Sequence, residues 1–433
     1  MIRHLLRFWL SFIIPTFYKR IQAHGLHHLY SNEPMIIAMN HPNAFTDPIL
    51  FSYLADPVRL HYMARGDAFK PGIASWLLEK IGIVPIFRMQ DAGKEGLKKN
   101  DATYRRVNAM LKNNAKVIVF AEGLCIQERR LRPLKKGVAR MVFGAHEFLQ
   151  HNRLKVLPVG VNYSKPDKFR SKALYMVGEP MRVADYYEAY KQHPAKTMNQ
   201  FLQDLDRNMK KLVIHICSSE NDDIVHWIEK LQKSELKSHA ANNNLHREFI
   251  QSQQIVELVE KADPEKLKSF HALAASYFKQ LNACRLKDWL FYPDQHKKNN
   301  WSMFCLRVLL LLICSPVYLA GLIFNLPPLA ATGFLTGKIV KEIEFFSSFA
   351  IGIGMFVFPL FYTVWFYLFY SLSCNLPAAL GLCLLAGLAG WATLFLHPFA
   401  LRTAGLWRYL QLGKNVKQLH KQRSVLLKFI NNF

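Results

Sequence analysis

Two long parts of the sequence contain no charged side chain. Asp, Glu, Lys and Arg are all missing from Val308 to Gly337 and again from Phe345 to Leu401. A soluble nucleic-acid-binding protein needs no such segments, so we exclude nucleic acid as a partner. Acidic residues are also few, since 31 Asp and Glu stand against 56 Lys and Arg, a net charge of +25. Such a basic excess needs a polyanionic surface, and in so apolar a chain we expect that surface to be membrane phospholipid.

Cysteine pairs of the kind that bind metals or form disulfide frameworks are also missing. The seven cysteines include no CxxC pair, which argues against a zinc site and against a disulfide-linked protein. We therefore expect a reducing, cytoplasm-facing environment and no metal. A GxSxG motif is absent too, which removes the signature of many serine hydrolases. Cys125 is the one nucleophile near the motifs described below, and the sequence pairs it with no base.

The N-terminus lacks a signal-peptide cleavage site. Its apolar run is interrupted by Arg7, and no small-residue site follows. We expect residues 1–20 to form an amphipathic helix that lies in a membrane interface. The alternative is an ordinary first helix packed on the domain that follows.

Residues 21–190 alternate short apolar strands with helical patterns. The expected strands cover residues 35–39, 58–64, 83–87, 116–121, 155–163 and 173–180. The expected helices cover residues 48–54, 70–82, 98–114 and 137–150. Strands separated by helices predict an α/β domain with a mostly parallel, buried sheet flanked by helices.

The rest of the chain is expected to be helical. Residues 191–300 carry apolar side chains at helical spacing with charges on the other faces, which predicts a soluble helical domain inserted before the membrane region. Residues 301–400 hold three apolar stretches long enough to be transmembrane helices, at 304–325, 346–370 and 376–396. Residues 401–433 mix leucines with Lys and Arg, which predicts a basic amphipathic tail.

The distribution of basic residues favours an even number of membrane crossings. Both the N-terminal domain and the C-terminal tail are basic, so both should face the cytoplasm. Three complete spans would separate them, and we therefore expect one segment to be re-entrant or interfacial. Pro316, Pro327 and Pro328 make the first segment the candidate. The sequence thus predicts an integral protein of the inner or cell membrane with its N-terminal domain on the cytoplasmic side.

A histidine and an aspartate stand at the two ends of one short loop. The apolar strand 35–39 ends at Asn40-His41, and Asp47-Pro48 opens a helical pattern with features of an N-cap and first turn. If the loop folds back, the Asp47 carboxylate bonds one imidazole nitrogen, and the other nitrogen serves as a general base. Such a pair suits attack by a substrate hydroxyl on an activated acyl group such as a thioester. The alternative is that Asp47 is only a cap and His41 a loop residue.

Four motifs, in this order, resemble those of the PlsC-like glycerolipid acyltransferases, the superfamily of glycerol-3-phosphate and 1-acylglycerol-3-phosphate acyltransferases. They are “NHPNAFTD” (40–47), similar to the NHxxxxD motif, “GIVPIFR” (82–88), “FAEGLC” (120–125), similar to FPEG, and “VLPVGVNY” (156–163). The similarity covers roughly residues 20–180.

The resemblance implies an O-acyltransferase that needs no cofactor. It would move a fatty acyl group from acyl-CoA or acyl-carrier protein to the hydroxyl of glycerol 3-phosphate or a lysophospholipid. His41 would be the base and Asp47 would orient it. Arg88 would bind phosphate, and Glu122-Gly123 would line the acceptor site or orient the basic residues that follow. The other substrate-binding residues that it implies are Asn40, Arg132, Lys135, Gly137 and Pro158.

Plainer alternatives and departures keep other hypotheses open. Arg88 is otherwise a solvated strand end, Glu122 a turn cap, and much of the basic run 128–140 a solvated face. The chain has Ala121 where FPEG has proline, and 124–126 read Leu-Cys-Ile in place of Thr-Arg-Ser. The second phosphate-binding arginine is thus missing from its place, and Arg129 or Arg132 is expected to substitute.

Two rival functions follow. An acceptor other than glycerol phosphate, such as an amino-acid-containing or envelope lipid, is the alternative enzyme. A membrane transporter or scaffold built by residues 301–433 is the non-enzymatic alternative, although this region has few charged residues at membrane depth.

Overall fold

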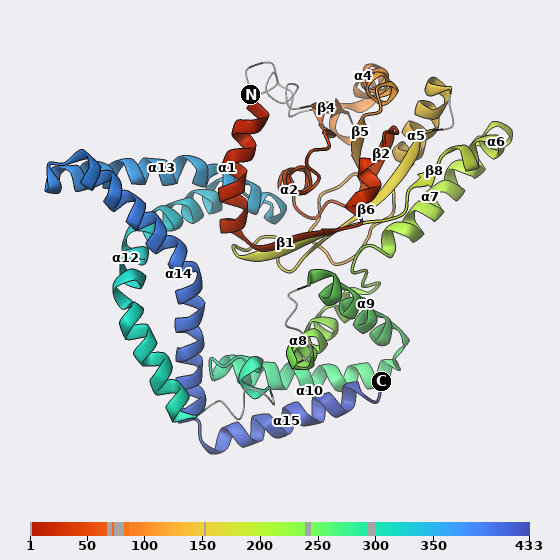
Figure 1. Ribbon diagram of the computed structural model, residues 1–433. Helices are drawn as coiled ribbons and strands as arrows, with labels where there is room; N and C mark the ends of the chain where they lie inside the picture. The colour runs from red at the N-terminus through yellow and green to blue at the C-terminus, as the bar shows by residue number, and fades with distance from the viewer. Residues whose placement is uncertain are drawn as a thin grey trace. The chain divides into compact units, whose positions relative to one another are not determined.

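The computed structural model describes residues 2–66, 72, 82–87, 89–150, 153–238, 244–292 and 300–433. The chain divides into two compact units. Unit 1 comprises Met1–His215 and the short segment Glu342–Phe349, and unit 2 comprises Ile216–Lys341 and Ala350–Phe433. Unit 1 is therefore built from two parts of the chain that are far apart in the sequence (Figure 1).

A mostly parallel sheet organises unit 1. Its eight described strands lie in the order β1-β7-β6-β2-β5-β3-β4, and β8 pairs with β6. Strand β6 runs antiparallel to β7 and β8, whereas the other described pairs are parallel. The strands are β1 (Tyr18–His24), β2 (Met35–Met39), β3 (Leu60–Arg65), β4 (Ile83–Ile86), β5 (Lys116–Phe120), β6 (Lys155–Tyr163), β7 (Ser171–Val177) and β8 (Met181–Arg182).

Strand β2 lies inside the sheet and is apolar on both faces. All five of its residues are buried, between β5 on one side and β6 on the other. A parallel strand that is covered on both faces carries apolar side chains at consecutive positions instead of alternating ones. The expected fold class, α/β with a mostly parallel sheet flanked by helices, is confirmed.

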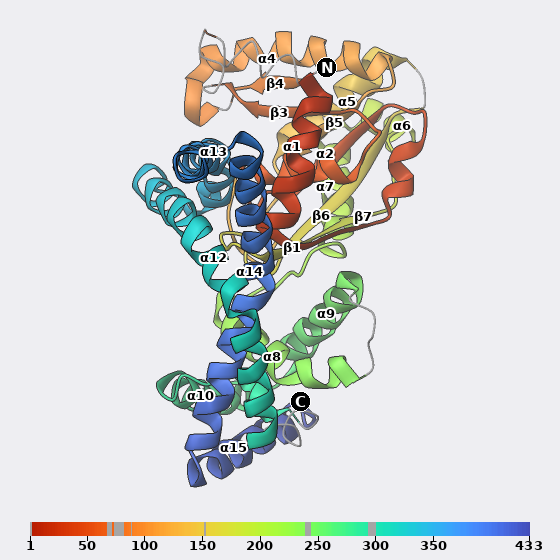
Figure 2. The ribbon, with the colours of Figure 1, turned by 60° about the vertical axis from the view of Figure 1, so that its left-hand side comes forward.

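In the view of Figure 2, helices of unit 1 lie in front of the strands and behind them. Helices α4, α5 and α7 pack on the sheet through one apolar cluster that includes Ile36 of β2, Val142 and Phe201. Helix α2 packs through Phe51, whose ring stacks on Tyr175 of β7 with centroids 5.4 Å apart. The helices are α1 (Ile2–Phe17), α2 (Thr46–Leu54), α4 (Met89–Lys112), α5 (Lys136–Leu149), α6 (Ala184–Gln192), α7 (Pro194–Lys210) and the 3-10 helix η1 (Leu26–Tyr30). Of the expected helix 70–82, all but residues 72 and 82 lie outside the described residues.

The N-terminal segment differs from the expected helix over residues 1–20. Helix α1 gives way at Tyr18 to the edge strand β1, which pairs in parallel with β7. On α1, Ile14 is buried, whereas Phe8 and Phe12 are 59% and 60% exposed. The helix therefore packs on unit 1 along one side and presents aromatic rings on another, and contact of those rings with a membrane stays a prediction.

Helix α7 belongs to unit 1, although its sequence lies within the helical domain expected at 191–300. Its apolar stripe, Phe201, Leu205 and Met209, is fully buried in the cluster that covers the sheet. The helical part of unit 2 thus begins after His215.

The regular secondary structure in the described residues of unit 2 is all helical. Its helices are η3 (Ser219–Asn221), α8 (Asp222–Ser238), α9 (Leu245–Lys261), α10 (Pro264–Ala283), η4 (Asp288–Phe291), α12 (Trp301–Ile339), the larger part of α13 (Phe346–Ser373), α14 (Leu376–Gln411) and α15 (Lys414–Ile430). Three described helices, at Trp301–Ile339, Ile343–Ser373 and Leu376–Gln411, are long and apolar enough to cross a membrane. They contain the three stretches expected from the sequence.

Helices α12 and α14 approach each other closely through small residues. A Cβ atom on Gly321 would come within 2.4 Å of the Ala389 carbonyl oxygen, so the contact requires glycine. The Asn325 amide donates to the Ala386 carbonyl at 3.0 Å and accepts from the Tyr362 hydroxyl at 2.8 Å. The polar side chain of α12 is thus satisfied by α14 and α13.

Helix α15 is anchored inside unit 2 by a buried ion pair. Arg423 Nε donates to Asp288 Oδ1 at 3.1 Å, and the Tyr277 hydroxyl of α10 donates to the same oxygen at 2.7 Å. Arg423 is 4% exposed and Asp288 8% exposed. The basic segment expected at 401–433 therefore continues α14 as far as Gln411 and then packs on α10.

Candidate active site

A histidine and an aspartate meet at the carboxyl edge of the sheet. Strand β2 ends at Met39, and His41 and Asp47 both lie in residues 40–47, called here the catalytic loop, which include the start of α2 at Thr46. Nδ1 of His41 lies 2.9 Å from Oδ2 of Asp47. The loop therefore folds back as the sequence analysis requires.

The start of α2 differs from the expectation in two respects. Phe45 is the N-cap, and Asp47 lies in the first turn. The Asp47 carboxylate does not cap the helix, because its Oδ2 accepts the Asn43 backbone amide at 2.8 Å and contacts His41. Five residues, 42–46, separate the histidine from the aspartate, one more than in the NHxxxxD motif. The Asp47 backbone amide donates to the Asn43 carbonyl at 3.0 Å, which closes the loop between His41 and Asp47 into a turn.

The Asp47 carboxylate is fully buried and has three hydrogen-bond donors. His41 and the Asn43 amide bond Oδ2, and the Tyr163 hydroxyl donates to Oδ1 at 2.7 Å. The Tyr175 hydroxyl donates to the Asp47 carbonyl at 3.0 Å. Burial, and then the charge of Asp47, raise the pKa values of both tyrosines well above the ordinary value. Of the two hydroxyls, that of Tyr163 bonds the carboxylate itself and, together with His41 and the Asn43 amide, compensates its burial, whereas that of Tyr175 bonds the backbone.

The His41 ring is held in a fixed plane. It stacks on Phe120, the last residue of β5, with ring centroids 3.6 Å apart and an angle of 13° between the planes. Its side chain is 16% exposed. Because Nδ1 faces Asp47, Nε2 is the nitrogen left for a substrate.

Asn40 ties the catalytic loop to strand β6. Its side-chain amide donates to the Val161 carbonyl at 3.1 Å, and its oxygen accepts the Val161 amide at 2.7 Å. The expected substrate contact of Asn40 stays a prediction, since both of these groups bond the neighbouring strand. The two bonds fix the residue next to His41.

Glu122 and Gly123 form a tight turn after β5. Gly123 has a φ of +66°, which favours glycine, and a Cβ atom there would lie 3.1 Å from Cγ of Lys135. Oε2 of Glu122 accepts the Arg132 backbone amide at 3.1 Å. Burial raises the pKa of Glu122 to about 7, against the opposing effect of backbone amides of Arg132 and His41. This carboxyl group thus bonds the backbone of the basic run at Arg132, and both roles expected for Glu122 stay predictions.

The basic run is partly neutralised. Arg132 donates to Glu128 at 2.7 Å, and Arg130 Nε lies 3.3 Å from the other oxygen of the same carboxylate. Lys135 is exposed at the N-cap of α5, and its backbone amide bonds the Ala121 carbonyl at 2.9 Å. The run is thus anchored to the loop of residues 121–128, called here the acidic loop.

The other expected substrate-binding residues lie in different settings. Gly137 is exposed in the first turn of α5. Pro158 is buried in β6 opposite Ala38 of β2, so its contacts are those of the sheet. Arg88 lies outside the described residues.

Cys125 links the two loops and is a poor nucleophile. Its Sγ accepts the Ala44 backbone amide of the catalytic loop at 3.1 Å. Burial, and then the charge of Asp47, raise the pKa of its thiol well above the ordinary value. A thiol that keeps its proton cannot serve readily in covalent catalysis.

Two contacts of the catalytic loop were not expected. Tyr163, which bonds Asp47, is the last residue of β6, and the sequence does show a polar side chain at the end of that strand. Ser348, which is 302 residues away from Thr46 in the sequence, lies with Oγ 2.8 Å from the Thr46 hydroxyl. Sequence spacing gives no sign of this second contact.

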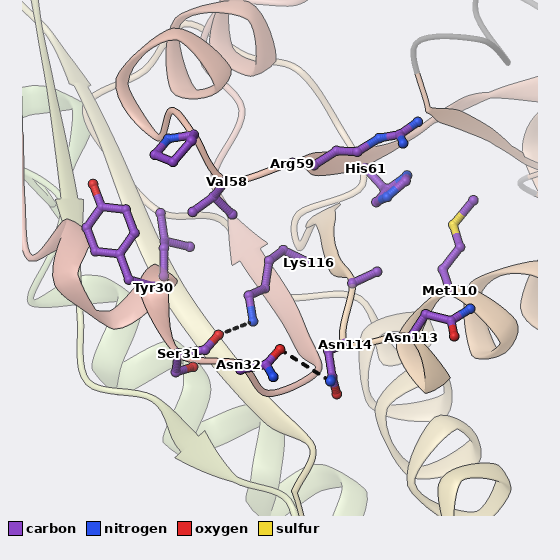
Figure 3. A pocket seen from close by; sticks show the side chains of 13 residues that line it. Tyr30, Ser31, Asn32, Val58, Arg59, His61, Met110, Asn113, Asn114 and Lys116 are labelled. Carbon is purple, nitrogen blue, oxygen red and sulfur yellow. Dashed lines mark hydrogen bonds between the residues drawn. The ribbon is translucent and has the colours of Figure 1, made fainter.

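A hollow of about 630 Å³ lies at the opposite edge of the sheet, where parallel strands begin (Figure 3). Its lining includes Ser31, Arg59 and Lys116, the first residue of β5. Lys116 Nζ donates to the Ser31 carbonyl at 2.7 Å and to the Glu33 carbonyl, and burial lowers its pKa to about 8. Because His41 follows the far end of β2, this hollow is separate from the candidate active site.

Known proteins share sequence with this region. Residues 20–162 match the family described as Acyltransferase. Glycerol-3-phosphate O-acyltransferase 1 of Saccharomyces cerevisiae is 27% identical over 138 residues, which cover 31% of this chain and 18% of the yeast protein. Glycerol-3-phosphate O-acyltransferase 2 of the same yeast is 33% identical over 111 residues, or 25% of this chain and 15% of that protein.

A plant protein and a solved bacterial structure were also matched. A chloroplastic 1-acyl-sn-glycerol-3-phosphate acyltransferase of Arabidopsis thaliana is 28% identical over 131 residues, which cover 30% of this chain and 34% of the plant protein. The solved 1-acyl-sn-glycerophosphate acyltransferase PlsC of Thermotoga maritima gives a TM-score of 0.33 at 15% identity, over 46% of this chain and 74% of that one. The chain matches less than a fifth of each of the two yeast relatives.

Proposed function

The chain carries, in residues 20–162, the sequence of the PlsC-like glycerolipid acyltransferase superfamily, and on this premise we propose that the protein is a membrane-bound O-acyltransferase of phospholipid biosynthesis. It would transfer a fatty acyl group from acyl-CoA or acyl-carrier protein to glycerol 3-phosphate or 1-acylglycerol 3-phosphate. The observation that carries the proposal is the 2.9 Å contact between His41 Nδ1 and Asp47 Oδ2 at the carboxyl edge of the sheet.

In the proposed reaction, Nδ1–H of His41 donates a hydrogen bond to Asp47, which leaves the lone pair of the imidazole on Nε2. Nε2 removes the proton of the acceptor hydroxyl while its oxygen attacks the carbonyl carbon of the thioester. The tetrahedral intermediate collapses with cleavage of the C–S bond, and the leaving thiolate receives the proton from the imidazolium. An oxygen ester and a free thiol are the products, and the His41–Asp47 pair returns to its starting state.

Acceptor phosphate would be bound by the basic residues that follow the acidic loop. We assign a direct contact to Lys135, because its side chain is exposed beside the Gly123 turn. Arg132 is shared with Glu128 and is the proposed substitute for the missing family arginine. Arg88 is retained as a phosphate ligand on the strength of its motif. Glu122 is assigned the orienting role, because its carboxylate bonds the Arg132 backbone.

The membrane region is proposed to cross the bilayer twice, with the unit that holds His41 on the cytoplasmic side. Segment Glu342–Phe349, which follows α12, belongs to unit 1. The other end of α12 joins unit 1 through residues 216–300, whose described helices include no candidate span. Both ends of α12 then lie on one side, which supports a re-entrant or interfacial helix; three prolines lie inside this continuous helix, where proline favours a bend. Protease in sealed inside-out vesicles should digest a tag after Phe433.

The activity is tested with the full chain in liposomes. Labelled acyl-CoA or acyl-carrier protein is offered with glycerol 3-phosphate, lysophosphatidate or an acylated amino-acid lipid, and products are identified by mass. We expect the two glycerophosphate acceptors to be acylated. Exclusive use of the amino-acid lipid would favour the alternative acceptor class, and no transfer to any acceptor would overturn the proposal.

A matched pair of histidine variants tests the base. His41→Ala should lower kcat by about 100-fold or more, the usual contribution of a general base. His193→Ala, at an exposed position of unit 1, should leave kcat unchanged. Substantial transfer by a folded His41→Ala variant would rule out the assigned role.

A further inference from the structure

Segment 342–349 joins two apolar helices in the sequence but packs in unit 1. It follows α12 and contains η5 (Ile343–Phe345) and the first turn of α13. Its contacts concentrate on the catalytic loop and the acidic loop. A simple connection between two helices would not need buried polar contacts to these loops.

Ser348 supplies a cap at the start of α2. The N-cap residue Phe45 has no side-chain acceptor to offer, although the first amides of a helix need partners. The Thr46 amide donates to Ser348 Oγ at 3.1 Å, and the Thr46 hydroxyl lies 2.8 Å from the same oxygen. Thr46 is 1% exposed, so these bonds are shielded from water. Since Asp47 is the next residue, Ser348 fixes the backbone that carries the carboxylate.

Two other residues of the segment lie beside the catalytic loop, one through a shared acceptor and one through a ring contact. The buried Ser347 hydroxyl donates to the Pro166 carbonyl, which also accepts the Asn43 side-chain amide at 3.0 Å. The Phe345 ring meets the Phe45 ring edge-on, with centroids 5.9 Å apart. Asn43 and Phe45 both belong to the catalytic loop, so the segment contacts it at more than one point.

The same segment also contacts the acidic loop. The Gln127 side-chain amide donates to the Ile343 carbonyl at 3.1 Å, and the Gln127 backbone amide donates to the Glu344 carboxylate at 3.4 Å. The two loops are bonded to each other as well, since the Ile126 amide donates to the His41 carbonyl at 3.1 Å. Segment 342–349 therefore bridges the loop of the base and the loop of Glu122.

We propose that residues 342–349 are a positioning element for acyl transfer, with Ser348 as the main positioning residue. The inference rests on the proposed function. The segment touches no reacting group in this arrangement, and it acts by holding the catalytic loop so that Asp47 meets His41. The connection between α12 and α13 is thereby part of the catalytic apparatus.

Three variants of the full chain in liposomes test this role. Ser348→Ala should lower kcat by about 10- to 100-fold, the scale of a small misplacement of reacting groups. Its KM for acyl-CoA should stay within about twofold, since substrate contacts remain. Ser348→Thr, which keeps the hydroxyl, should recover most of the rate. Thr363→Ala is the matched control on α13, because that hydroxyl bonds the Pro359 carbonyl of its own helix, and it should turn over like the wild type.

A double-mutant cycle gives a second measurement. Thr46→Val and Ser348→Ala together should lower kcat no further than Ser348→Ala alone, because both remove the same contact. Additive losses of kcat in the double variant would overturn the positioning role. A wild-type kcat in Ser348→Ala would also overturn it, provided that His41→Ala is inactive. If His41→Ala also keeps the wild-type rate, the proposed function itself fails and the positioning role fails with it.

Discussion

The hydroxyl of Tyr163 donates to Oδ1 of Asp47 at 2.7 Å, while His41 bonds Oδ2 of the same carboxylate. The tyrosine is the last residue of β6 and the aspartate lies in the first turn of α2, so the bond ties the catalytic loop to a strand inside the sheet. Because burial raises its pKa well above the ordinary value, the hydroxyl keeps its proton and remains a donor.

Tyr163→Phe should therefore weaken both catalysis and stability. The variant leaves a buried carboxylate oxygen without its donor, which costs about 1–3 kcal/mol in the free energy of unfolding. We expect kcat to fall about tenfold, because Asp47 holds His41 less firmly. Tyr186→Phe is the matched control, since it removes a hydroxyl bonded to Asp204 away from the site, and its kcat should not change. Equal kcat values in both variants would contradict the assignment.

Glu122→Gln should change the pH dependence of stability. Burial raises the pKa of Glu122 from 4.5 to about 7, so the folded protein binds this proton more tightly than the unfolded chain. The wild-type free energy of unfolding therefore loses roughly 3 kcal/mol as the pH rises from about 4.5 to about 7. Glutamine does not titrate, so thermal melts should show the variant gaining on the wild type between about pH 5 and about pH 8. Parallel curves would mean that Glu122 is not held protonated.

Asn40→Ala tests whether this residue acts through the fold or through the substrate. Losing both bonds to Val161 leaves two backbone groups without these partners, so the free energy of unfolding should fall by about 2–4 kcal/mol. If Asn40 acts through the fold, kcat should fall and the KM for the acceptor should change little. Asn162→Ala removes an equivalent pair of bonds, to Leu212 and Ile214, and should lose similar stability while keeping kcat. A raised acceptor KM at normal stability of Asn40→Ala would instead indicate direct substrate contact.

Arg423→Met should destabilise unit 2. The change leaves Asp288 buried without its cation, and breaking a buried pair costs about 3–5 kcal/mol. Combining Arg423→Met with Asp288→Asn removes the unpaired buried charge and keeps an acceptor for Tyr277. The double variant should therefore recover much of the thermal midpoint that the single variant loses. An unchanged midpoint for Arg423→Met would show that the pair adds little.

The inner strands could be predicted because their signal is local. The ranges expected for β2 and β6 agree with those observed; β2 is apolar throughout, and β6 has no polar side chain from Val156 to Val161. Strand β1 was missed because its sequence, YKRIQAH, is largely polar and becomes a strand by pairing with β7 at the sheet edge. The N-cap expected at Asp47 was wrong, because its carboxylate is taken up by His41, Asn43 and Tyr163.

The candidate site could be predicted only in part, for a similar reason. His41 and Asp47 lie close in the sequence, so a motif identifies both. The partners of Asp47 and Thr46, Tyr163 and Ser348, come from distant parts of the chain and are brought in by the tertiary fold. No spacing rule connects such residues.

The discontinuity of unit 1 limits how its gene can be shortened. A reading frame stopped after His215 would encode all eight described strands together with His41 and Asp47, but would omit the oxygen that accepts the Thr46 amide. A truncated chain would have to regain residues 342–349 through a designed linker, or as a separately added peptide. On the proposed role of this segment, a fragment without that graft should show a lower kcat than the full chain.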